Sequence, residues 1–344
     1  MHEEDFTVTH FLTHKIDRRQ MIISAMAGAA LLRSPRTLVA QDASPAAGEW
    51  TFTDDKGVTV TLPSQPERLV IDVNAAAPLW DFGIRPQALF GWNVLADGSF
   101  GDAGGNIDPE GIAIVGDVNE RIRIEDLIAQ EPDLIITVAW DLEDPKAYWS
   151  IDAELVDQVN AVAPVIAIST TGMADANTQR FAELAALLGA DLETPELKSA
   201  EADYEAAIQR FKDAAAANSD LTALFLAPTP ETVWVAYGPD WADLNMYGEF
   251  GLTIVEPDAE PGSFWEQISH EQALKYPADM VFISTRAESL SAEDMAKSPT
   301  WSKHPAVAAG QMYPWNQDFI QSYQGMADAL NGIADATEAA EKVS

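Results

Sequence analysis

The segment Glu125-Asp-Leu-Ile-Ala-Gln-Glu-Pro-Asp133-Leu-Ile-Ile136 contains an acidic start, apolar residues three or four apart, a proline, an aspartate and an apolar run. The same order returns in Glu271-Gln-Ala-Leu-Lys-Tyr-Pro-Ala-Asp279-Met-Val-Phe-Ile283. This spacing predicts about two helical turns, a tight turn and a buried strand in each segment. Because the unit occurs twice, we expect two related α/β lobes.

Short apolar runs typical of strands alternate with helical segments or loops around both copies of the repeat. The first series extends from Arg68 to Ile168, after a predicted hairpin at 51–62. The second extends from Leu221 to Tyr313. Such alternation predicts the α/β class, with a largely parallel sheet flanked by helices in each lobe.

Residues 177–217 are mostly helix formers, interrupted near Gly189 and Pro195, and contain no strand-like run. We expect a long connector helix there, which permits limited hinge motion between the lobes. The length of 344 residues also favours two domains, since a single core usually stops growing at ~250 to 300 residues. The predicted division is an export signal at 1–41, a flexible tether at 42–50, an N-terminal lobe at 51–175, a connector region at 176–218 and a C-terminal lobe at 219–344.

The N-terminus has the parts of an export signal: a polar leader, an apolar run from Met21 to Leu32 and a small-residue stretch. The apolar run is too short to span a bilayer, which needs ~20 residues. The pair Arg18 and Arg19 resembles a twin-arginine signal, which sends folded proteins across the membrane. Asp17 and Met21 depart from that pattern, so general secretion and a buried N-terminal helix remain alternatives.

The formal net charge is −35, and the chain contains no cysteine. Such a charge argues against binding to nucleic acid or to an anionic membrane surface, because phosphates are repelled. The lack of cysteine excludes disulfides, thiolate metal sites, cysteine nucleophiles and a lipid-modified cysteine anchor.

Motifs of catalysis and of nucleotide binding are missing from the sequence. Beyond the leader only His270 and His304 remain, too few for a multi-histidine metal site, and we expect both at surface helix ends. The sequence therefore predicts a protein that is not an enzyme and holds neither a metal nor a cofactor of its own.

Ligands of open α/β sheets bind beyond the carboxyl ends of the strands, so two facing lobes create a cleft. Rigid aromatic side chains in these loops suit a bulky, partly apolar ligand. The alternative for each ring is ordinary packing, and for Arg286 a surface ion pair. The predicted ligand-binding residues are Asn74, Trp92, Trp140, Tyr237, Trp241, Trp265, Arg286 and Trp315.

Several segments together resemble the helical-backbone (class III) substrate-binding proteins of ABC importers. They are the segment 62–71 after the hairpin, the segment 124–136, the connector, Trp265-Glu-Gln-Ile-Ser-His-Glu-Gln-Ala-Leu274 and Pro305-Ala-Val-Ala-Ala-Gly-Gln-Met-Tyr313. Members capture ferric siderophores, vitamin B12 or haem outside the membrane. The resemblance implies that the lobes clamp a ligand and that Glu125 and Glu271 meet arginines of the permease. The alternative is that each acid only complements a helix dipole.

The resemblance also bears on the ligand. Vitamin B12 binders of the family have a tryptophan at the position of Trp265, which this chain shares. They also have a tryptophan where this chain has Val138, and a basic residue in the loop that matches 316–322, where this chain has none. These two departures argue against vitamin B12. Catecholate binders often gather several basic residues, whereas Arg286 is the one candidate cleft cation. A hydroxamate or mixed Fe(III)-siderophore complex fits better.

The expected function is therefore that of an exported, monomeric receptor, on the outer side of the membrane, that captures a ferric siderophore and delivers it to the transmembrane subunits of an ABC transporter. A cobalamin or haem receptor of the same architecture is the alternative. An extracytoplasmic enzyme that uses the cleft for chemistry is the third possibility.

Overall fold

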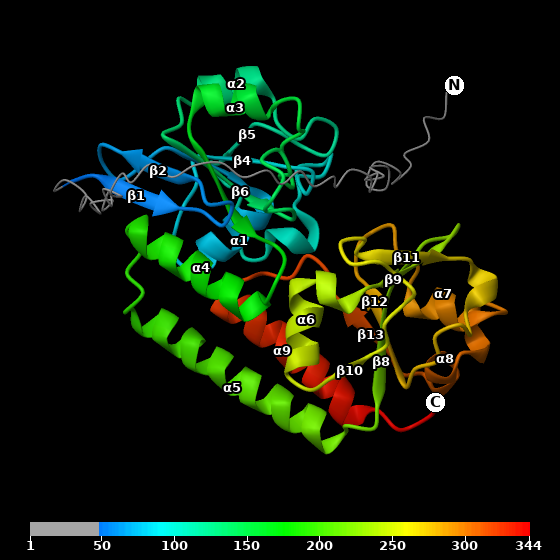
Figure 1. The fold of residues 1–344 in the computed structure, drawn as a ribbon. Coiled ribbons are helices and arrows are strands. Elements are labelled where there is room, and N and C mark those ends of the chain that lie inside the picture. Colours follow the sequence, from blue (N-terminus) through cyan, green and yellow to red (C-terminus); the bar gives the residue numbers. More distant parts are fainter. Residues whose placement is uncertain (1–47) are drawn as a thin grey trace, which may run out of the picture. The chain divides into compact units, whose positions relative to one another are not determined.

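The computed structural model describes residues 48–344. The predicted export signal, with Arg18 and Arg19, and the first part of the predicted tether lie outside the described residues. Residues 48–344 form two α/β lobes that are joined by long helices (Figure 1).

The N-terminal lobe, or N-lobe, contains a hairpin and a five-stranded parallel sheet in the order β5-β4-β3-β6-β7. The hairpin pairs β1 (Trp50–Thr53) with β2 (Thr59–Leu62). The sheet strands are β3 (Leu69–Asp72), β4 (Ala88–Phe90), β5 (Ala113–Ile114), β6 (Leu134–Ala139) and β7 (Val165–Ser169). The helices are α1 (Val73–Asp81), α2 (Ile124–Ala129), α3 (Val156–Val162) and α4 (Ala174–Leu187), with a 3₁₀ turn, η2 (Gly101–Gly104). Strands β3, β6 and β7 are buried along their whole length, as the apolar runs predict for a sheet covered on both faces.

The C-terminal lobe, or C-lobe, contains a six-stranded sheet in the order β11-β9-β8-β12-β13, with β10 also paired to β8. Its strands are β8 (Thr222–Pro228), β9 (Val233–Ala236), β10 (Thr253–Ile254), β11 (Trp265–Ile268), β12 (Met280–Ser284) and β13 (Met312–Trp315). Strands β8, β10, β12 and β13 are parallel, whereas β9 and β11 are antiparallel to their neighbours. The α-helices are α6 (Ala242–Glu249), α7 (Ala292–Lys297), α8 (Pro305–Ala309) and α9 (Tyr323–Ala339). Three 3₁₀ turns, η3 (Gly238–Asp240), η4 (His270–Gln272) and η5 (Trp301–Lys303), complete the lobe.

The connector helix α5 (Pro195–Ala217) is capped by Thr194, whose side chain accepts a hydrogen bond from Leu197 N, and proline occupies its first turn. It packs along α9, and the two helices run side by side from the N-lobe to the C-lobe (Figure 1). Tyr204 of α5 stacks on Tyr323 of α9 with ring centroids 5.8 Å apart. The connector is therefore a pair of helices, of which the sequence predicted only α5. The predicted domain boundaries stay predictions.

The two copies of the repeat have the same structure in their second part, a buried strand, and different structures in their first part. Glu125 lies in the first turn of the short helix α2, but Glu271 lies in the single 3₁₀ turn η4. The expectation of about two helical turns after Glu271 is therefore wrong. A capping box between Ser269 and Gln272 closes η4, and this stretch buries only Ala273, too little apolar surface to sustain a longer helix.

Three further expectations need correction. Trp265 opens strand β11, which the sequence did not predict, and Trp315 ends strand β13 rather than lying in the loop after it. His304 is fully buried, with Nε2 2.9 Å from the carbonyl oxygen of Tyr276, so it is not a surface residue. Burial lowers the pKa of His304, because the imidazolium form loses its hydration.

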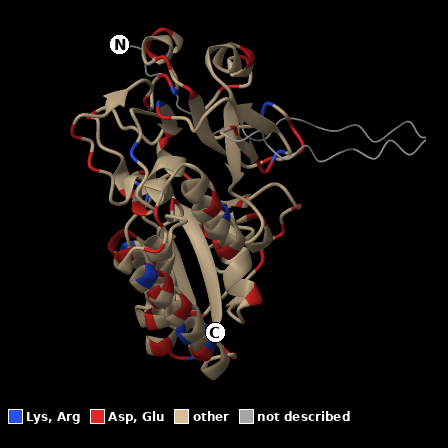
Figure 2. Ribbon diagram, turned by 90° about the vertical axis from the view of Figure 1, so that its left-hand side faces the viewer, with Lys and Arg blue, Asp and Glu red and all other residues tan. Residues whose placement is uncertain are grey.

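Acidic residues are spread over both lobes and the connector helices and outnumber Lys and Arg (Figure 2). No helix among residues 48–344 combines the length and the apolar character needed to cross a membrane.

Candidate functional site

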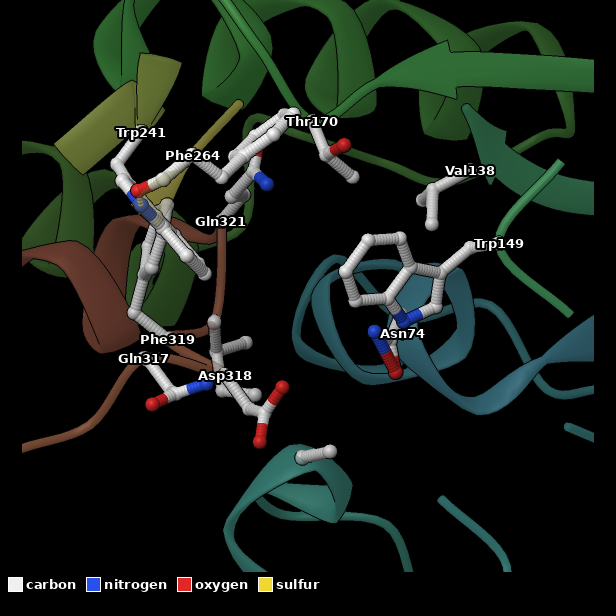
Figure 3. A pocket seen from close by; sticks show the side chains of 12 residues that line it. Asn74, Val138, Trp149, Thr170, Trp241, Phe264, Gln317, Asp318, Phe319 and Gln321 are labelled. Carbon is white, nitrogen blue, oxygen red and sulfur yellow. Dashed lines mark hydrogen bonds between the residues drawn. The ribbon is translucent and has the colours of Figure 1, made fainter. Parts of the chain in front are cut away.

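A small pocket lies between the two lobes at the carboxyl ends of their strands (Figure 3). The N-lobe contributes Asn74, Ala103, Val138, Trp149 and Thr170. The C-lobe contributes Trp241, Phe264 and the run Gln317, Asp318, Phe319, Ile320 and Gln321. Its free volume is about 50 Å³. This is room for a few water molecules, whereas pockets for small-molecule ligands measure ~300 to 1,000 Å³.

The N-lobe floor of the pocket depends on Asp72, the last residue of β3. Its carboxylate caps helix α1 by accepting from Asn74 N at 3.0 Å. The other carboxylate oxygen accepts from Thr137 Oγ1 of strand β6 at 2.8 Å. Asn93 donates its side-chain amide to Asn74 Oδ1, which fixes the orientation of the Asn74 side chain. Burial raises the pKa of Asp72 to about 6, because the charged carboxylate is taken out of water.

Gly91 directly follows strand β4 and precedes Trp92. Its φ is 123°, and a Cβ atom there would lie 2.8 Å from Ser150 Oγ and 3.1 Å from Asp72 Oδ1. Only glycine fits this approach. The chain can therefore turn against the floor and direct Trp92 toward Trp149, whose ring centroid lies 5.9 Å away.

Aromatic rings form the C-lobe side of the pocket. Trp241 contacts Trp265 and Trp315 edge to face, with ring centroids 4.9 and 5.4 Å apart. The indole N–H of Trp241 donates to the carbonyl oxygen of Phe264 at 3.0 Å. These edge-to-face pairs hold Trp241 rigidly at the pocket wall.

Phe264 adopts a left-handed backbone conformation, with φ of 62°. Such a conformation costs a bulky residue ~1 to 2 kcal/mol. Asp240 holds the loop in place, because its Oδ2 accepts from Phe264 N at 2.9 Å and from Gly262 N at 2.8 Å. The Phe264 ring stands edge-on to Trp241 of its own lobe and to Trp140 of the N-lobe, at 5.5 and 6.5 Å. A strained residue thus fills the space between the lobes.

The charged groups at the pocket neutralise one another. Arg286 donates to both carboxylate oxygens of Asp318, at 2.8 and 2.6 Å. Gln317, in the amide orientation that satisfies its neighbours, accepts from Arg286 Nε at 3.0 Å and donates to Ser284 Oγ at 2.6 Å. The Arg286 guanidinium also lies over the Trp92 ring of the N-lobe, 4.8 Å from its centroid. Arg286 therefore connects the lobes and has its charge matched by Asp318.

The predicted binding residues divide into three groups. Asn74 and Trp241 line the pocket. Trp92, Trp140 and Arg286 make the contacts between lobes described above, and Tyr237 is half-buried beside η3. Trp265 and Trp315 pack behind Trp241, and Trp315 is only 2% exposed. Ligand contact by any of these residues stays a prediction.

The sequence reasoning missed Trp149, Thr170, Phe264 and the run 317–321. Thr170 and the run 317–321 directly follow strands β7 and β13, so the rule for carboxyl ends of strands could have found them. Trp149 and Phe264 lie in irregular segments far from the preceding strand end, and no local pattern marks them.

The two acids predicted to dock are exposed. Glu125 lies in the first turn of α2 and Glu271 in η4, each on its own lobe. Among the described residues no group of three or more His, Asp or Glu is arranged to hold a metal ion.

Comparison with known proteins agrees with this architecture. Residues 113–319 match the model of the periplasmic binding protein family. The structure is similar to that of DesE, a ferric-siderophore receptor from Streptomyces coelicolor, with 31% identity, a TM-score of 0.79 and coverage of 86% of this chain and 100% of that chain. No curated protein matches the chain.

More distant structures share the fold. The petrobactin-binding protein YclQ from Bacillus subtilis is 17% identical with a TM-score of 0.63, over 84% of this chain and 99% of that one. The siderophore-binding protein FhuD from Vibrio cholerae, solved with Fe³⁺–Desferal, is 16% identical with a TM-score of 0.55, over 80% and 99%. The match over 113–319 and the full-length similarity to DesE show that this chain belongs to the periplasmic binding protein family.

Proposed function

We propose that this chain is an exported receptor that captures a ferric siderophore between its two lobes and delivers it to an ABC permease. The observation that carries the proposal is the aromatic pocket at the carboxyl ends of strands from both lobes. Such a pocket suits a bulky chelate with an apolar periphery. The similarity to DesE, a ferric-siderophore receptor, supports the same ligand class.

The charge at the pocket favours a neutral or cationic complex. None of the pocket-lining residues within 48–344 is Lys, Arg or His, and Asp318 contributes a carboxylate. Arg286, next to the pocket, already forms a bidentate pair with Asp318. A strongly anionic tris-catecholate would find no uncompensated cation there, whereas a ferric trihydroxamate meets no repulsion. We therefore propose a hydroxamate or mixed siderophore.

The pocket must widen to take up such a ligand. The free volume of about 50 Å³ is far below that of a siderophore complex, so the lobes or the Phe264 loop must move apart. The connector pair α5 and α9 joins the lobes and permits limited bending there. We propose that the described conformation is the closed one, which opens to admit ligand.

We propose further that the iron arrives already chelated, so that the cleft residues bind the organic shell and catalyse no reaction. The receptor acts as a monomer outside the membrane, after export through the predicted twin-arginine signal. Its docking to the permease uses Glu125 and Glu271, which project from separate lobes into solvent.

Tryptophan fluorescence tests the ligand. Fe(III)–Desferal, a trihydroxamate with a free ammonium, a ferric tris-catecholate, cobalamin and haem are titrated into the purified chain. We expect submicromolar quenching by Fe(III)–Desferal, binding of the tris-catecholate at least tenfold weaker, and no turnover of either. If only cobalamin or haem quenched the fluorescence, the siderophore proposal would be wrong and that compound would be the ligand.

A further inference from the structure

The acids of the repeat each have an exposed apolar neighbour at the same position. Ile128 follows Glu125 by three residues, and Leu274 follows Glu271 by three. Their exposed fractions are 54% and 55%, the highest among the large hydrophobic residues of the described chain. Both copies of the repeat therefore present an acid and an apolar side chain together.

The burial pattern repeats residue by residue. In the N-lobe copy Leu127 is buried between exposed neighbours, and in the C-lobe copy Ala273 is buried in the same position. These two residues anchor their segments to the lobe cores. Because the anchors are Leu127 and Ala273, folding does not require an apolar residue at position 128 or 274. Position 128 lies in an α-helix and position 274 beyond a 3₁₀ turn, so a shared local fold does not explain the match either.

The acids carry charge that other residues of the described chain do not cancel by ion pairing. The neighbouring cations have partners of their own: Arg123 pairs with Asp117 and Asp126, and Lys275 with Asp258 and Glu266. No ion pair within residues 48–344 involves Glu125 or Glu271. Glu271 has a hydrogen bond from the Ser269 side chain and an electrostatic attraction to His270, which lower its pKa, but it forms no salt bridge to another described residue. Each lobe thus offers one exposed carboxylate that no lysine or arginine of residues 48–344 pairs with, beside one apolar side chain.

We propose that Ile128 and Leu274 are apolar anchors of a two-point docking surface. Since the same pair of side chains occurs once on each lobe, the complementary partner is a dimer of two equivalent subunits, each with a basic residue beside an apolar pocket. Resting on the proposed function, we assign this partner to the two transmembrane subunits of the permease. The acids guide and orient the encounter, and the apolar side chains, which lose their contact with water, slow dissociation.

Binding to spheroplasts of the native cells, grown under iron limitation, tests the proposal. Fluorescently labelled chain is bound to the spheroplasts and displaced by unlabelled competitor. We expect I128N and L274N each to compete about tenfold more weakly than the unsubstituted chain, and the double variant about a hundredfold more weakly. L187N is the matched control, since Leu187 is also exposed, at 39%, but lies on α4 outside the repeat.

Two controls separate the interpretations. The melting temperature and the Fe(III)–Desferal affinity of I128N, L274N and L187N should equal those of the unsubstituted chain, because exposed positions contribute little to folding. Benzophenone side chains placed at positions 128 and 274 should crosslink to an integral membrane protein of the spheroplasts.

The outcomes are distinguishable. Saturable binding of the unsubstituted chain with undiminished competition by the I128N/L274N variant overturns the anchor role alone. Crosslinks only between two copies of the chain assign the surface to self-association instead and also overturn it. Absence of saturable binding by the unsubstituted chain overturns the proposed delivery to a permease, and with it the anchors.

Discussion

The indole N–H of Trp315 donates to Oδ2 of Asp243 across 2.8 Å inside the C-lobe, where Asp243 is fully buried. Its other oxygen, Oδ1, has no hydrogen-bond partner. Burial raises the pKa of Asp243 to about 7, and the hydrogen bond from Trp315 opposes this only in part. The carboxyl group that holds Trp315 in the cluster with Trp241 therefore keeps its proton to a much higher pH than an exposed aspartate does.

Asp243 should make the C-lobe less stable as the pH rises. Its folded-state pKa lies above the ordinary value of 3.8, so the folded chain holds this proton more tightly than the unfolded chain does. The stabilising contribution is present in full below pH ~4 and is lost as the pH rises through about 7. We expect D243N, which keeps an acceptor for Trp315, to be more stable than the unsubstituted chain at pH 8 by roughly 2 to 4 kcal/mol. The advantage should vanish near pH 4, and urea unfolding at both pH values measures it. An advantage that is equal at the two pH values would contradict this account.

The aspartate that both copies of the repeat place before the strand, Asp133 and Asp279, explains why the sequence pattern predicted the sheets so well. Asp133 accepts from the backbone N–H of Glu67 and Arg68, just before β3, and Asp279 accepts from Thr222 N at the start of β8. In both lobes the aspartate before one central strand therefore fixes the start of its parallel neighbour. Where an apolar strand is preceded by an aspartate that hydrogen-bonds to the start of the neighbouring strand, the register between the two strands has little freedom. The helical part lacks this constraint, so the prediction after Glu271 was wrong.

Asp279 should contribute more to the free energy of unfolding than Asp133 does. Burial alone would raise the pKa of Asp279, but hydrogen bonds from Lys342 and from the backbone N–H of Val343, Ser344 and Thr222 hold it well below its usual range. Asp133 makes fewer such bonds and is partly exposed. We expect Asp279→Ala to cost about 3 kcal/mol at pH 7 and Asp133→Ala about 1 kcal/mol.

The contribution of Asp279 also has a pH dependence of the opposite sign to that of Asp243. Because its folded-state pKa is depressed, its stabilisation is present above the ordinary pKa of 3.8 and is lost as the pH falls below it. The difference in unfolding free energy between the unsubstituted chain and Asp279→Ala should therefore shrink from pH 5 toward pH 2. If Asp279→Ala and Asp133→Ala lost the same unfolding free energy, the greater burial of Asp279 would not determine how much each aspartate stabilises the fold.

The pair of Arg286 and Asp318 provides a test of ligand charge. In D318N the carboxylate is lost, so the Arg286 charge next to the pocket is no longer compensated. We expect D318N to bind Fe(III)–Desferal about tenfold more weakly and an anionic ferric tris-catecholate more tightly than the unsubstituted chain does. R286Q should shift the two affinities in the opposite sense. Parallel changes for both ligands would instead indicate that the pair only supports the fold, and the melting temperatures of both variants distinguish the two cases.

The sequence predicted the site less completely than the fold. Rings that directly follow strands, such as Trp92 and Trp140, could be placed near the cleft because parallel strands end at one edge of the sheet. The burial of each ring could not be predicted, since it depends on how the rings pack against one another. Trp241 reaches the pocket, whereas Trp315 packs behind it and does not. The pairing of Arg286 with Asp318 joins residues 32 positions apart across two neighbouring strand ends. The amino-acid sequence alone does not indicate that Arg286 pairs with Asp318.

Phe264 offers a test of the closed conformation. Glycine adopts a φ of 62° without strain, whereas alanine retains the cost. The free energy of unfolding, measured with denaturant, should therefore be about 1 kcal/mol higher for F264G than for F264A. Both variants lose the ring that stands between Trp140 and Trp241. If this ring must leave before ligand enters, both should bind Fe(III)–Desferal with an association rate constant about tenfold higher, because more molecules are open at any time. Stopped-flow tryptophan quenching measures this rate, and N245A, which removes a hydrogen bond from the C-lobe to Gly172 O away from the ring, is the control for general loosening of the lobes. An association rate that rises equally in N245A, or not at all in F264G, would mean that Phe264 is a wall of the pocket and not its gate.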